Sequence, residues 1–427
     1  MSDLALLGGA PAVEGPLKPF RAIGEREREL VNEVIDGGLL SGFYGSWGDE
    51  FWGGPMVKRL EELWRGKLGC RHVVSVNSAT SGLFAAAGAI GLSPGDEVIC
   101  PPTTMSATAV APMFYGAVPV FADIEEETFG LDPAAVAAAI GPKTKAIFAV
   151  NLFGHPARLA ELRALADRHG LYLVEDNAQG PFAMEYGRPA GTIGHIGVFS
   201  LNVHKHIQTG EGGLCVTEDN NLALRMQMIR NHGENVVRDV EVGDIANTMG
   251  LNFRMTELSA AVGVGQIERA AEIIDGRVAI AERLSAGLAG IDGFAVPTVR
   301  QGCRHVYYVW TARADPQVLG IRRETLVAAL QAEGVPAAGG YVAPLYRLPL
   351  FRERRAIGRD GFPFTGSNQG YGDGLCPVAE AMHATGFVTY EICAHDPDPA
   401  QLDQLVAGVR KVIAGAGELA DWERRQP

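Results

Sequence analysis

One lysine in this sequence has the setting of a residue that forms a covalent bond. The chain has 37 lysine and arginine residues, and only seven of them are lysine; one, Lys205, lies in the segment FSLNVHKHIQTGEGG. A lysine amine that loses its proton on burial can attack a carbonyl carbon and form an imine, whereas arginine stays protonated. Parallel sheets bind ligands where their strands end, so a lysine that follows the apolar run 197–200 is a candidate nucleophile. An exposed loop lysine is the alternative interpretation.

Two carboxylates end a second apolar run. In GLYLVEDNAQG, Glu175 and Asp176 close a segment that predicts a buried strand, and we expect them at the sheet edge where Lys205 emerges. A buried carboxylate requires a cationic partner. A protonated pyridine nitrogen would provide one, because an aspartate that keeps the ring protonated makes pyridoxal phosphate an electron sink. The alternative is a cap for the following turn, and for Glu175 we favour such a structural role.

A third segment predicts a site for a single phosphate group. In VVSVNSATSGLFAAAGAIG a strand leads into residues 78–82 and then into a helix. Small hydroxyl residues at a helix start present backbone N–H groups and side-chain donors at the positive end of the helix dipole. An ordinary serine or threonine helix cap is the alternative. No GxGxxG follows a strand and no GxxxxGK[ST] occurs, so the sequence does not support a dinucleotide or P-loop site.

Other motifs predict no further site. His204 and His206 flank Lys205, but an HxH pair offers two ligands with no third at recognisable spacing, so no metal site is predicted. We interpret these histidines as packing or substrate-pocket residues. The GEGG run at 210–213 is typical of a tight turn, and there is no GxSxG motif of a serine hydrolase.

Composition excludes several classes of protein. The 427 residues carry a formal net charge of −13, which disfavours a nucleic-acid partner, and 47% hydrophobic against 20% charged residues predicts a folded chain. The six cysteines lack paired spacing, as is typical of a reducing compartment. We see no signal sequence and no stretch of the roughly 18 apolar residues that a membrane span requires. We therefore expect a cytoplasmic protein with no membrane partner.

The elements that must position these residues alternate along the first part of the chain. Between residues 71 and 216, short β-branched runs alternate with alanine-rich stretches, which predicts a mostly parallel sheet covered by helices. The expected strands are 72–76, 97–100, 118–121, 146–150, 171–174, 197–200 and 214–216. The expected helices are 81–90, 107–115, 157–169 and 222–230.

A second domain is expected after this sheet. The stretch 256–288 is amphipathic with a helical period, so it is a predicted connector between the two domains. We place the N-terminal arm and large domain at 1–270 and the small C-terminal domain at 271–427. Helices are predicted at 322–333 and 399–414, and the segment 348–377, rich in Gly, Pro and Arg, predicts a long ordered loop.

Taken in order, the phosphate site, the aspartate and the lysine resemble the DegT/StrS family of pyridoxal-phosphate sugar aminotransferases. SLNVHKHIQTGEGG is similar to the family's Schiff-base signature, and EDNAQ to its ED-x-A-Q/H box. Further similar segments are GLSPGDEVICPPTTMSAT, GAVPVFADIEEETFGLDP, GLNFRMTELSAAVG, CPVAE and the opening LALLGGAPAV, which resembles members acting on cyclitols. The resemblance implies fold type I, that of aspartate aminotransferase. That fold is α/β: a mostly parallel seven-stranded sheet covered by helices, plus a smaller α+β C-terminal domain.

The resemblance also implies roles for the residues around the cofactor ring. Lys205 would form the Schiff base and then move the proton between cofactor and substrate carbon. Asp176 would pair with the pyridinium nitrogen, and Gln179 would hydrogen-bond the phenolic oxygen of the ring. Ala178 would pack under one face of the ring.

A second group of residues would hold the cofactor's phosphate. The backbone of Ala79 and the side chains of Thr80 and Ser200 match the family's phosphate-binding positions. Asn252 would reach the phosphate of the neighbouring subunit. This implies a homodimer with shared active sites.

The chain departs from the family pattern at three positions. Most members have an aromatic residue stacked on the pyridine ring where this chain has Met105, which covers a ring through dispersion and sulfur contacts. Leu201 replaces the usual aromatic after Ser200, and Ala79 replaces a common glycine. The acid-base and imine residues are intact, so the departures concern contacts to the ring face.

The activity implied is transamination in two halves. L-glutamine or L-glutamate would give its amino group to the cofactor, and a keto-sugar, free or nucleotide-linked, or a keto-cyclitol would then accept it. One alternative is a sugar dehydratase of the same family, but that branch has a histidine in place of Lys205. The other is a non-catalytic regulator, which would not need Lys205, Asp176 and Gln179 together.

The sequence leaves the acceptor open. The pocket would be lined by loops from both subunits, including the region 341–374. Arginines in this region could meet a diphosphate or a carboxylate, or could form a solvated face, and we favour the binding role. They are Arg347, Arg352, Arg354, Arg355 and Arg359.

Overall fold

A seven-stranded sheet forms the centre of the molecule. The computed structural model describes residues 2–426 and orders the strands β1-β9-β8-β5-β4-β2-β3. Strand β9 is antiparallel to both of its neighbours, and every other neighbouring pair is parallel. The carboxyl ends of all the strands except β9 therefore meet at one edge. The strands are β1 (His72–Val76), β2 (Glu97–Cys100), β3 (Val118–Phe121), β4 (Thr144–Val150), β5 (Tyr172–Asp176), β8 (Ile196–Ser200) and β9 (Gly213–Thr217).

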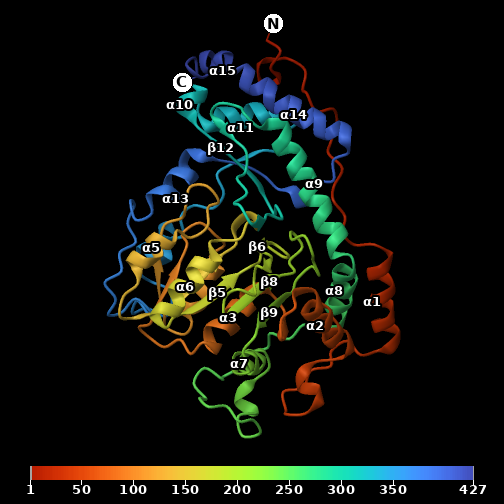
Figure 1. The fold of residues 1–427 in the computed structure, drawn as a ribbon, viewed down its shortest axis with the longest axis vertical. Coiled ribbons are helices and arrows are strands. Elements are labelled where there is room, and N and C mark those ends of the chain that lie inside the picture. Colours follow the sequence, from red (N-terminus) through yellow and green to blue (C-terminus); the bar gives the residue numbers. More distant parts are fainter. Residues whose placement is uncertain (1, 427) are drawn as a thin grey trace.

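Helices cover both faces of this sheet (Figure 1). Alternate strand residues point to opposite faces, so Ile147 and Leu173 join one buried cluster while Phe148 and Val174 join the other. Burial on both faces explains why these strands are almost continuously apolar. The helices are α1 (Glu25–Gly37), α2 (Pro55–Leu68), α3 (Ala79–Ala89), α4 (Ala107–Met113), α5 (Pro133–Ala139), α6 (Leu159–His169), α7 (Asn220–Arg230) and α8 (Glu257–Glu268).

A smaller antiparallel sheet is formed by strands that follow the long helix α9 (Ala270–Leu288) in the chain. Its four strands are ordered β10-β12-β14-β13, and helices α11 and α14 lie with it at the top of Figure 1. Asp398 and Gln401 form a capping box that starts α14, with Pro399 in its first turn. The elements are β10 (Phe294–Ala295), β12 (Trp310–Ala314), β13 (Ala338–Gly339), β14 (Phe387–Tyr390), α11 (Arg323–Ala332) and α14 (Pro399–Ala414).

This architecture confirms the predicted fold class. Three of the seven predicted strands have the observed bounds, and the others differ by one or two residues at an end. The predicted connector 256–288 is two helices, α8 and α9, with Arg269 between them at φ −105°. Helices α1, α2 and α5 were not predicted, and their caps show why they form: Asp132, for example, accepts a hydrogen bond from Ala134 N and begins α5.

Two segments pack away from their neighbours in sequence. Leu4 and Val13 lie in the buried cluster of the C-terminal sheet, where Glu333 accepts hydrogen bonds from Ala5 N and Ala12 N. Residues of the 345–379 region pack against the large sheet instead. The division at 270/271 stays a prediction.

Short elements complete the described chain, and none of its helices is long and apolar enough to cross a membrane. Three short strands form a third sheet, ordered β11-β6-β7. The short elements are β6 (Met184–Glu185), β7 (Arg188–Pro189), β11 (Cys303–Arg304), α10 (Pro316–Leu319), α12 (Pro349–Arg352), α13 (Pro377–Ala381) and α15 (Ala416–Glu423).

Candidate active site

The residues predicted from the sequence converge on one cavity of about 370 Å³ at the carboxyl edge of the large sheet. They arrive from the ends of different strands: β1 leads into α3, β5 ends at Asp176, and the loop after β8 carries Lys205. A cavity of this volume accommodates a small cofactor. The predicted residues that line it are Ala79, Thr80, Met105, Asp176, Ala178, Gln179, Ser200 and Lys205.

Lys205 is partly buried in the wall of this cavity. Its Nζ lies 3.9 Å from the centroid of the Tyr308 ring. Burial lowers the pKa of the lysine from 10.5 to about 8, and the charge of Asp176 opposes this shift. The neutral amine, which is the form that can attack a carbonyl, is therefore far more populated near neutral pH than in an ordinary lysine.

Asp176 is a buried carboxylate held by neutral donors. Thr108 donates its hydroxyl to Oδ2 at 2.6 Å, and the Ala178 N–H donates to Oδ1 at 3.2 Å. Within the described residues no arginine or lysine nitrogen lies within 4.0 Å of it. Burial raises the pKa of Asp176, and the charge of Lys205 lowers it. The carboxylate thus lacks a close cationic partner in the cavity.

Gln179 is fixed so that its amide nitrogen faces the cavity. Its Oε1 accepts from Phe153 N at 2.7 Å, and its Nε2 donates to the Tyr341 hydroxyl at 3.0 Å. Because the oxygen is bound to the backbone, the NH₂ group remains as the donor on the cavity side. Phe153 has a φ of 57°, an uncommon conformation for a bulky residue.

The start of α3 forms part of the cavity wall. Ser78 caps the helix by accepting from Ser81 N at 3.1 Å, which leaves the N–H groups of Ala79 and Thr80 without partners inside the helix. A Cβ at Gly213 would lie 2.6 Å from the carbonyl carbon of Ser78, so glycine lets β9 approach the helix start closely. Ser200 lines the cavity beside this helix start.

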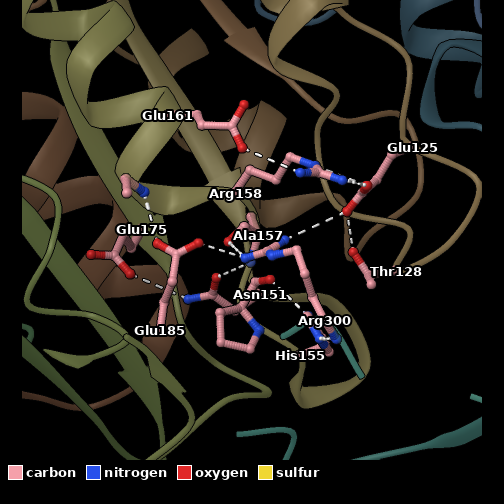
Figure 2. A network of polar contacts seen from close by, with 12 residues as sticks. Glu125, Thr128, Asn151, His155, Ala157, Arg158, Glu161, Glu175, Glu185 and Arg300 are labelled. Carbon is pink, nitrogen blue, oxygen red and sulfur yellow. Dashed lines mark hydrogen bonds and ion pairs between the residues drawn. The ribbon is translucent and has the colours of Figure 1, made fainter. Parts of the chain in front are cut away.

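A buried polar network holds the end of β5 on the side of the strand opposite the cavity (Figure 2). The Glu175 carboxylate accepts from Ile193 N at 2.8 Å and from Gly191 N and Gly194 N at 2.5 Å each. Asn151 donates to the same carboxylate at 3.3 Å. Glu175 is fully buried and points away from the cavity, so it anchors the strand that ends at Asp176.

The same network continues toward Arg300 in Figure 2. The Arg300 guanidinium donates to Glu185 Oε1 at 2.5 Å and to the Ala157 carbonyl at 3.0 Å. The Arg300 backbone N–H donates to His155 Nε2 at 3.1 Å. His155 Nδ1 in turn bonds the Pro156 carbonyl at 2.8 Å. Burial lowers the pKa of His155 to about 4, so the ring is neutral and structural.

Asn252 is the predicted site residue that does not reach this cavity. Its side chain is exposed, and its Oδ1 accepts from Arg254 Nε at 2.9 Å. The prediction assigned it to the neighbouring subunit's phosphate, and that role remains a prediction. Met105 does line the cavity and is 63% exposed, whereas Leu201 is fully buried in the core.

Several residues of the cavity were missed by sequence reasoning. Thr104, Tyr308, Glu211 and Asn202 line it, and Thr108 holds Asp176 from just outside. Thr108 lies in the quoted PPTTMSAT segment, so a hydroxyl near the aspartate could have been suspected there. Tyr308 has no local signal, because its contact with Lys205 joins segments distant in sequence.

The arginines of the 341–374 region are held mostly by their own loop. We expected them to bind an anionic substrate, and that role stays a prediction. Arg347 and Arg352 both bind Asp373, at 2.8 and 2.6 Å, and Arg354 donates to the carbonyls of Gln369 and Phe364. Arg355 lies 3.9 Å from Glu353. These ion pairs and hydrogen bonds order the long loop, and none of the five arginines lines the cavity.

The cavity fits pyridoxal phosphate. Asp176 lacks a close cation that a protonated ring nitrogen would supply, and the open N–H groups of Ala79 and Thr80 suit a phosphate. Lys205 brings an amine of lowered pKa to the same space. Fold and cavity therefore define a pyridoxal-phosphate enzyme of fold type I.

The chain belongs to the DegT/DnrJ/EryC1/StrS aminotransferase family, whose sequence model matches residues 25–370. Members of this family depend on pyridoxal phosphate, and the chain is an aminotransferase. Both the enzyme class and the cofactor expected from the sequence are thereby confirmed.

Similar proteins include enzymes named for cyclitol and sugar substrates. A Streptomyces kanamyceticus protein with the provisional name L-glutamine:3-amino-2,3-dideoxy-scyllo-inosose aminotransferase is 34% identical, over 98% of this chain and 99% of that protein. The dTDP-3-amino-3,4,6-trideoxy-alpha-D-glucose transaminase of Streptomyces venezuelae is 35% identical, over 79% of this chain and 85% of that protein. The solved structure of DesI in the presence of its TDP-sugar product has a TM-score of 0.80 at 30% identity, covering 99% of this chain and 98% of DesI.

Proposed function

We propose that this aminotransferase transfers the amino group of L-glutamine or L-glutamate to the ring ketone of a cyclitol or sugar. The observation that carries the proposal is the convergence of Lys205, Asp176, Gln179 and the start of α3 on one cavity. These are an amine, a carboxylate, an amide donor and a phosphate site. They are the groups that hold pyridoxal phosphate and move a proton beside it.

Each group has a separate task in this proposal. When bound, pyridoxal phosphate withdraws electrons from the carbon that carries the amino group. Asp176 keeps the ring nitrogen protonated, and Gln179 donates to the ring oxygen. Ala79, Thr80 and Ser200 hold the phosphate, and Ala178 packs under the ring. Lys205, as a neutral amine, would move the proton between the donor's carbon and the cofactor carbon that receives the amino group.

We propose a keto-cyclitol as the acceptor. The relative named for an inosose substrate matches 98% of this chain, whereas the one named for a nucleotide-linked sugar matches 79%. The arginine pairs point the same way, because a diphosphate requires cations free to bind it and those of the 341–374 region are mostly engaged.

A nucleotide-linked keto-sugar is the second candidate acceptor. It is favoured by the likeness to DesI over nearly the whole of both chains, since DesI was solved with a TDP-sugar. The partner subunit's exposed residues would have to supply the cations for the diphosphate. The dehydratase and regulatory alternatives find no support in a cavity that keeps Lys205, Asp176 and Gln179 together.

We also propose a homodimer with shared sites. Large apolar side chains are exposed on the 39–47 and 245–251 segments, including Leu40 at 52% and Met249 at 79%. These segments are neighbours, because Asn231 Nδ2 donates to the Tyr44 carbonyl and Asn231 forms a β-bridge with Asn252. An apolar surface of this kind, next to Asn252, fits a second copy of the chain.

The acceptor is tested by following a labelled nitrogen. Purified protein with pyridoxal phosphate is incubated with L-glutamine labelled at its α-amino nitrogen and either a keto-inositol or a TDP-linked keto-sugar. The proposal predicts a labelled amino-cyclitol in the mass spectrum and little labelled amino sugar. Labelling of the TDP-sugar alone would establish the second candidate, and labelling of neither would contradict both.

A further inference from the structure

Tyr308 holds an unassigned position directly beside the candidate catalytic lysine. Its ring centroid lies 3.9 Å from Lys205 Nζ, which is close for a contact between an amine and an aromatic face. The ring is partly buried and forms part of the cavity wall. Burial raises the pKa of the Tyr308 phenol, so the ring is neutral and its face attracts a cation.

The segment that carries Tyr308 is tied to the loop that carries Lys205. His206, which directly follows Lys205, donates its Nε2–H to the Val306 carbonyl at 2.8 Å. The rings of His206 and Tyr308 also lie near each other, with centroids 6.2 Å apart. Burial lowers the pKa of His206 to about 4, so this link is present as a neutral imidazole donor at ordinary pH.

A second link fixes the same segment to Gln179. The Val306 N–H donates to the Gly154 carbonyl at 3.0 Å, and Phe153 N, one residue earlier, donates to Gln179. A Cβ at Gly154 would lie 2.9 Å from Tyr308 N, and Gly154 has a φ of 95°, so glycine is required for this close approach. Tyr307 also has a positive φ, 53°. Such strained, buried backbone indicates that the position of Tyr308 is closely determined.

Other groups around Lys205 do not duplicate this contact. Asp176 and Glu391 influence the lysine through charge, whereas burial raises the pKa of the Cys393 thiol to about 12 and of Tyr341 to about 12. Those two groups are therefore neutral. The Tyr341 hydroxyl is bonded to Gln179 instead.

We propose that Tyr308 is a positioning residue for Lys205, whose ring face holds the lysine amine whenever that amine is not bonded to the cofactor. The inference rests on the proposed role of Lys205. The lysine would be free while the cofactor carries the amino group, and its amine would then rest on the Tyr308 ring. The ring also stabilises the ammonium form, so it sets how readily the lysine gives and accepts a proton.

The test measures the pKa of Lys205 in full-length protein saturated with pyridoxamine 5′-phosphate. This form has no aldehyde, so it leaves the lysine amine free. Acetylation of Lys205 by acetic anhydride is quantified by mass spectrometry as the pH is raised. Tyr308→Phe keeps the ring, Tyr308→Leu removes it while keeping an apolar cover, and Tyr341→Leu removes another cavity aromatic as the control.

The proposal predicts the same midpoint for the parent, Tyr308→Phe and Tyr341→Leu. In Tyr308→Leu the loss of the ring lowers the midpoint by about half to one pH unit. An unchanged midpoint in Tyr308→Leu, or an equal fall in Tyr308→Phe, would overturn the proposal. If Tyr308→Leu does not fold, as judged by circular dichroism, Tyr308→Met is used in its place. A lowered acetylation midpoint would again support the proposal, and an unchanged midpoint would overturn it.

An absorbance measurement tests the role of Lys205 separately from that of Tyr308. The parent protein with pyridoxal phosphate should show a visible absorbance band that Lys205→Ala lacks. If that band is absent from the parent, the proposed role of Lys205 fails. The midpoint comparison would still decide whether the Tyr308 ring holds the lysine amine.

Discussion

Lys205 combines a basic side chain with a partly buried position, and this combination has a cost in stability. A lysine amine in ordinary solution is almost fully protonated at neutral pH, but the cavity wall lowers its pKa to about 8. Asp176 limits the shift through its charge, and the Tyr308 ring is close enough to favour the ammonium form. Burial of this amine therefore lowers the free energy of unfolding.

A lysine-free variant makes this cost measurable. Lys205 in the unfolded chain holds its proton up to about pH 10.5, whereas in the folded chain it releases the proton near pH 8. The loss of stability caused by burying the charged lysine is therefore at its full size below pH 8. We expect cofactor-free Lys205→Met to melt at a higher temperature than the parent at pH 7. The difference should shrink as the pH rises from about 8 to about 10.5.

The control is Lys143→Met, which replaces an exposed lysine. Its melting temperature should follow that of the parent across the same pH range. A Lys205→Met variant that is less stable than the parent at pH 7 would contradict the account of a desolvated lysine.

Among the elements, the end of β5 is held by several buried hydrogen bonds. Glu175 and Asp176 are neighbours with opposite roles, because alternate strand residues face opposite ways. Asp176 faces the cavity, while Glu175 accepts three backbone N–H groups from the 191–194 turn. The anchor on one side of the strand therefore holds the functional carboxylate on the other.

Glu175→Gln tests this anchor. The amide would turn an NH₂ group toward a buried backbone N–H, so we expect a loss of about 2–4 kcal/mol in the free energy of unfolding. Chemical denaturation measures it directly. Glu161→Gln is the matched control in the same network (Figure 2), since Glu161 is exposed and its ion pair with Arg158 should contribute less than about 1 kcal/mol. Equal losses in the two variants would contradict the anchoring role.

The sequence predicted the strands of the large sheet well and the cavity residues beside them. Runs such as HVVSV and EVIC are buried on both faces, so their apolar, β-branched residues identify them without any knowledge of the partners. Helix α2, for example, was harder to predict, because six of its 14 residues are charged. The short strands β10 and β13 carry too few residues for a periodic pattern.

Contacts between distant segments lay beyond sequence reasoning. Tyr308 meets Lys205 only because the Val306 and Gly154 backbones pair, and no spacing in the sequence encodes that pairing. The partners of the arginines in the 341–374 region were not predicted, for a similar reason. Their partners, such as Asp373, lie within the loop, and a composition cannot tell a paired arginine from a free one.

At the scale of the molecule, the proposed dimer gives each site residues from two chains. Lys205 serves the cavity of its own subunit, and Asn252 would serve that of the partner. Mixing two defective variants tests this arrangement. Lys205→Ala lacks the amine, and Asn252→Asp would repel the partner's phosphate, so each variant alone should be nearly inactive.

Refolding the two variants together would restore one complete site in each mixed dimer. With random pairing, we expect about a quarter of the parent's activity, since half of the dimers are mixed and each has one intact site. Refolding each variant alone is the control. Activity no greater than that of the separate variants would contradict sharing of the site across a dimer interface.

In the proposed function, Lys205 and its neighbours carry out an amino-transfer half-reaction with pyridoxal phosphate. The most direct measurement is the absorbance spectrum of purified protein with the cofactor, before and after L-glutamine or L-glutamate is added, beside Lys205→Ala. The parent should show a visible band that the donor converts to the spectrum of pyridoxamine phosphate, and the variant should show no such band. A parent without the band, or a variant that behaves like the parent, would contradict this role of Lys205.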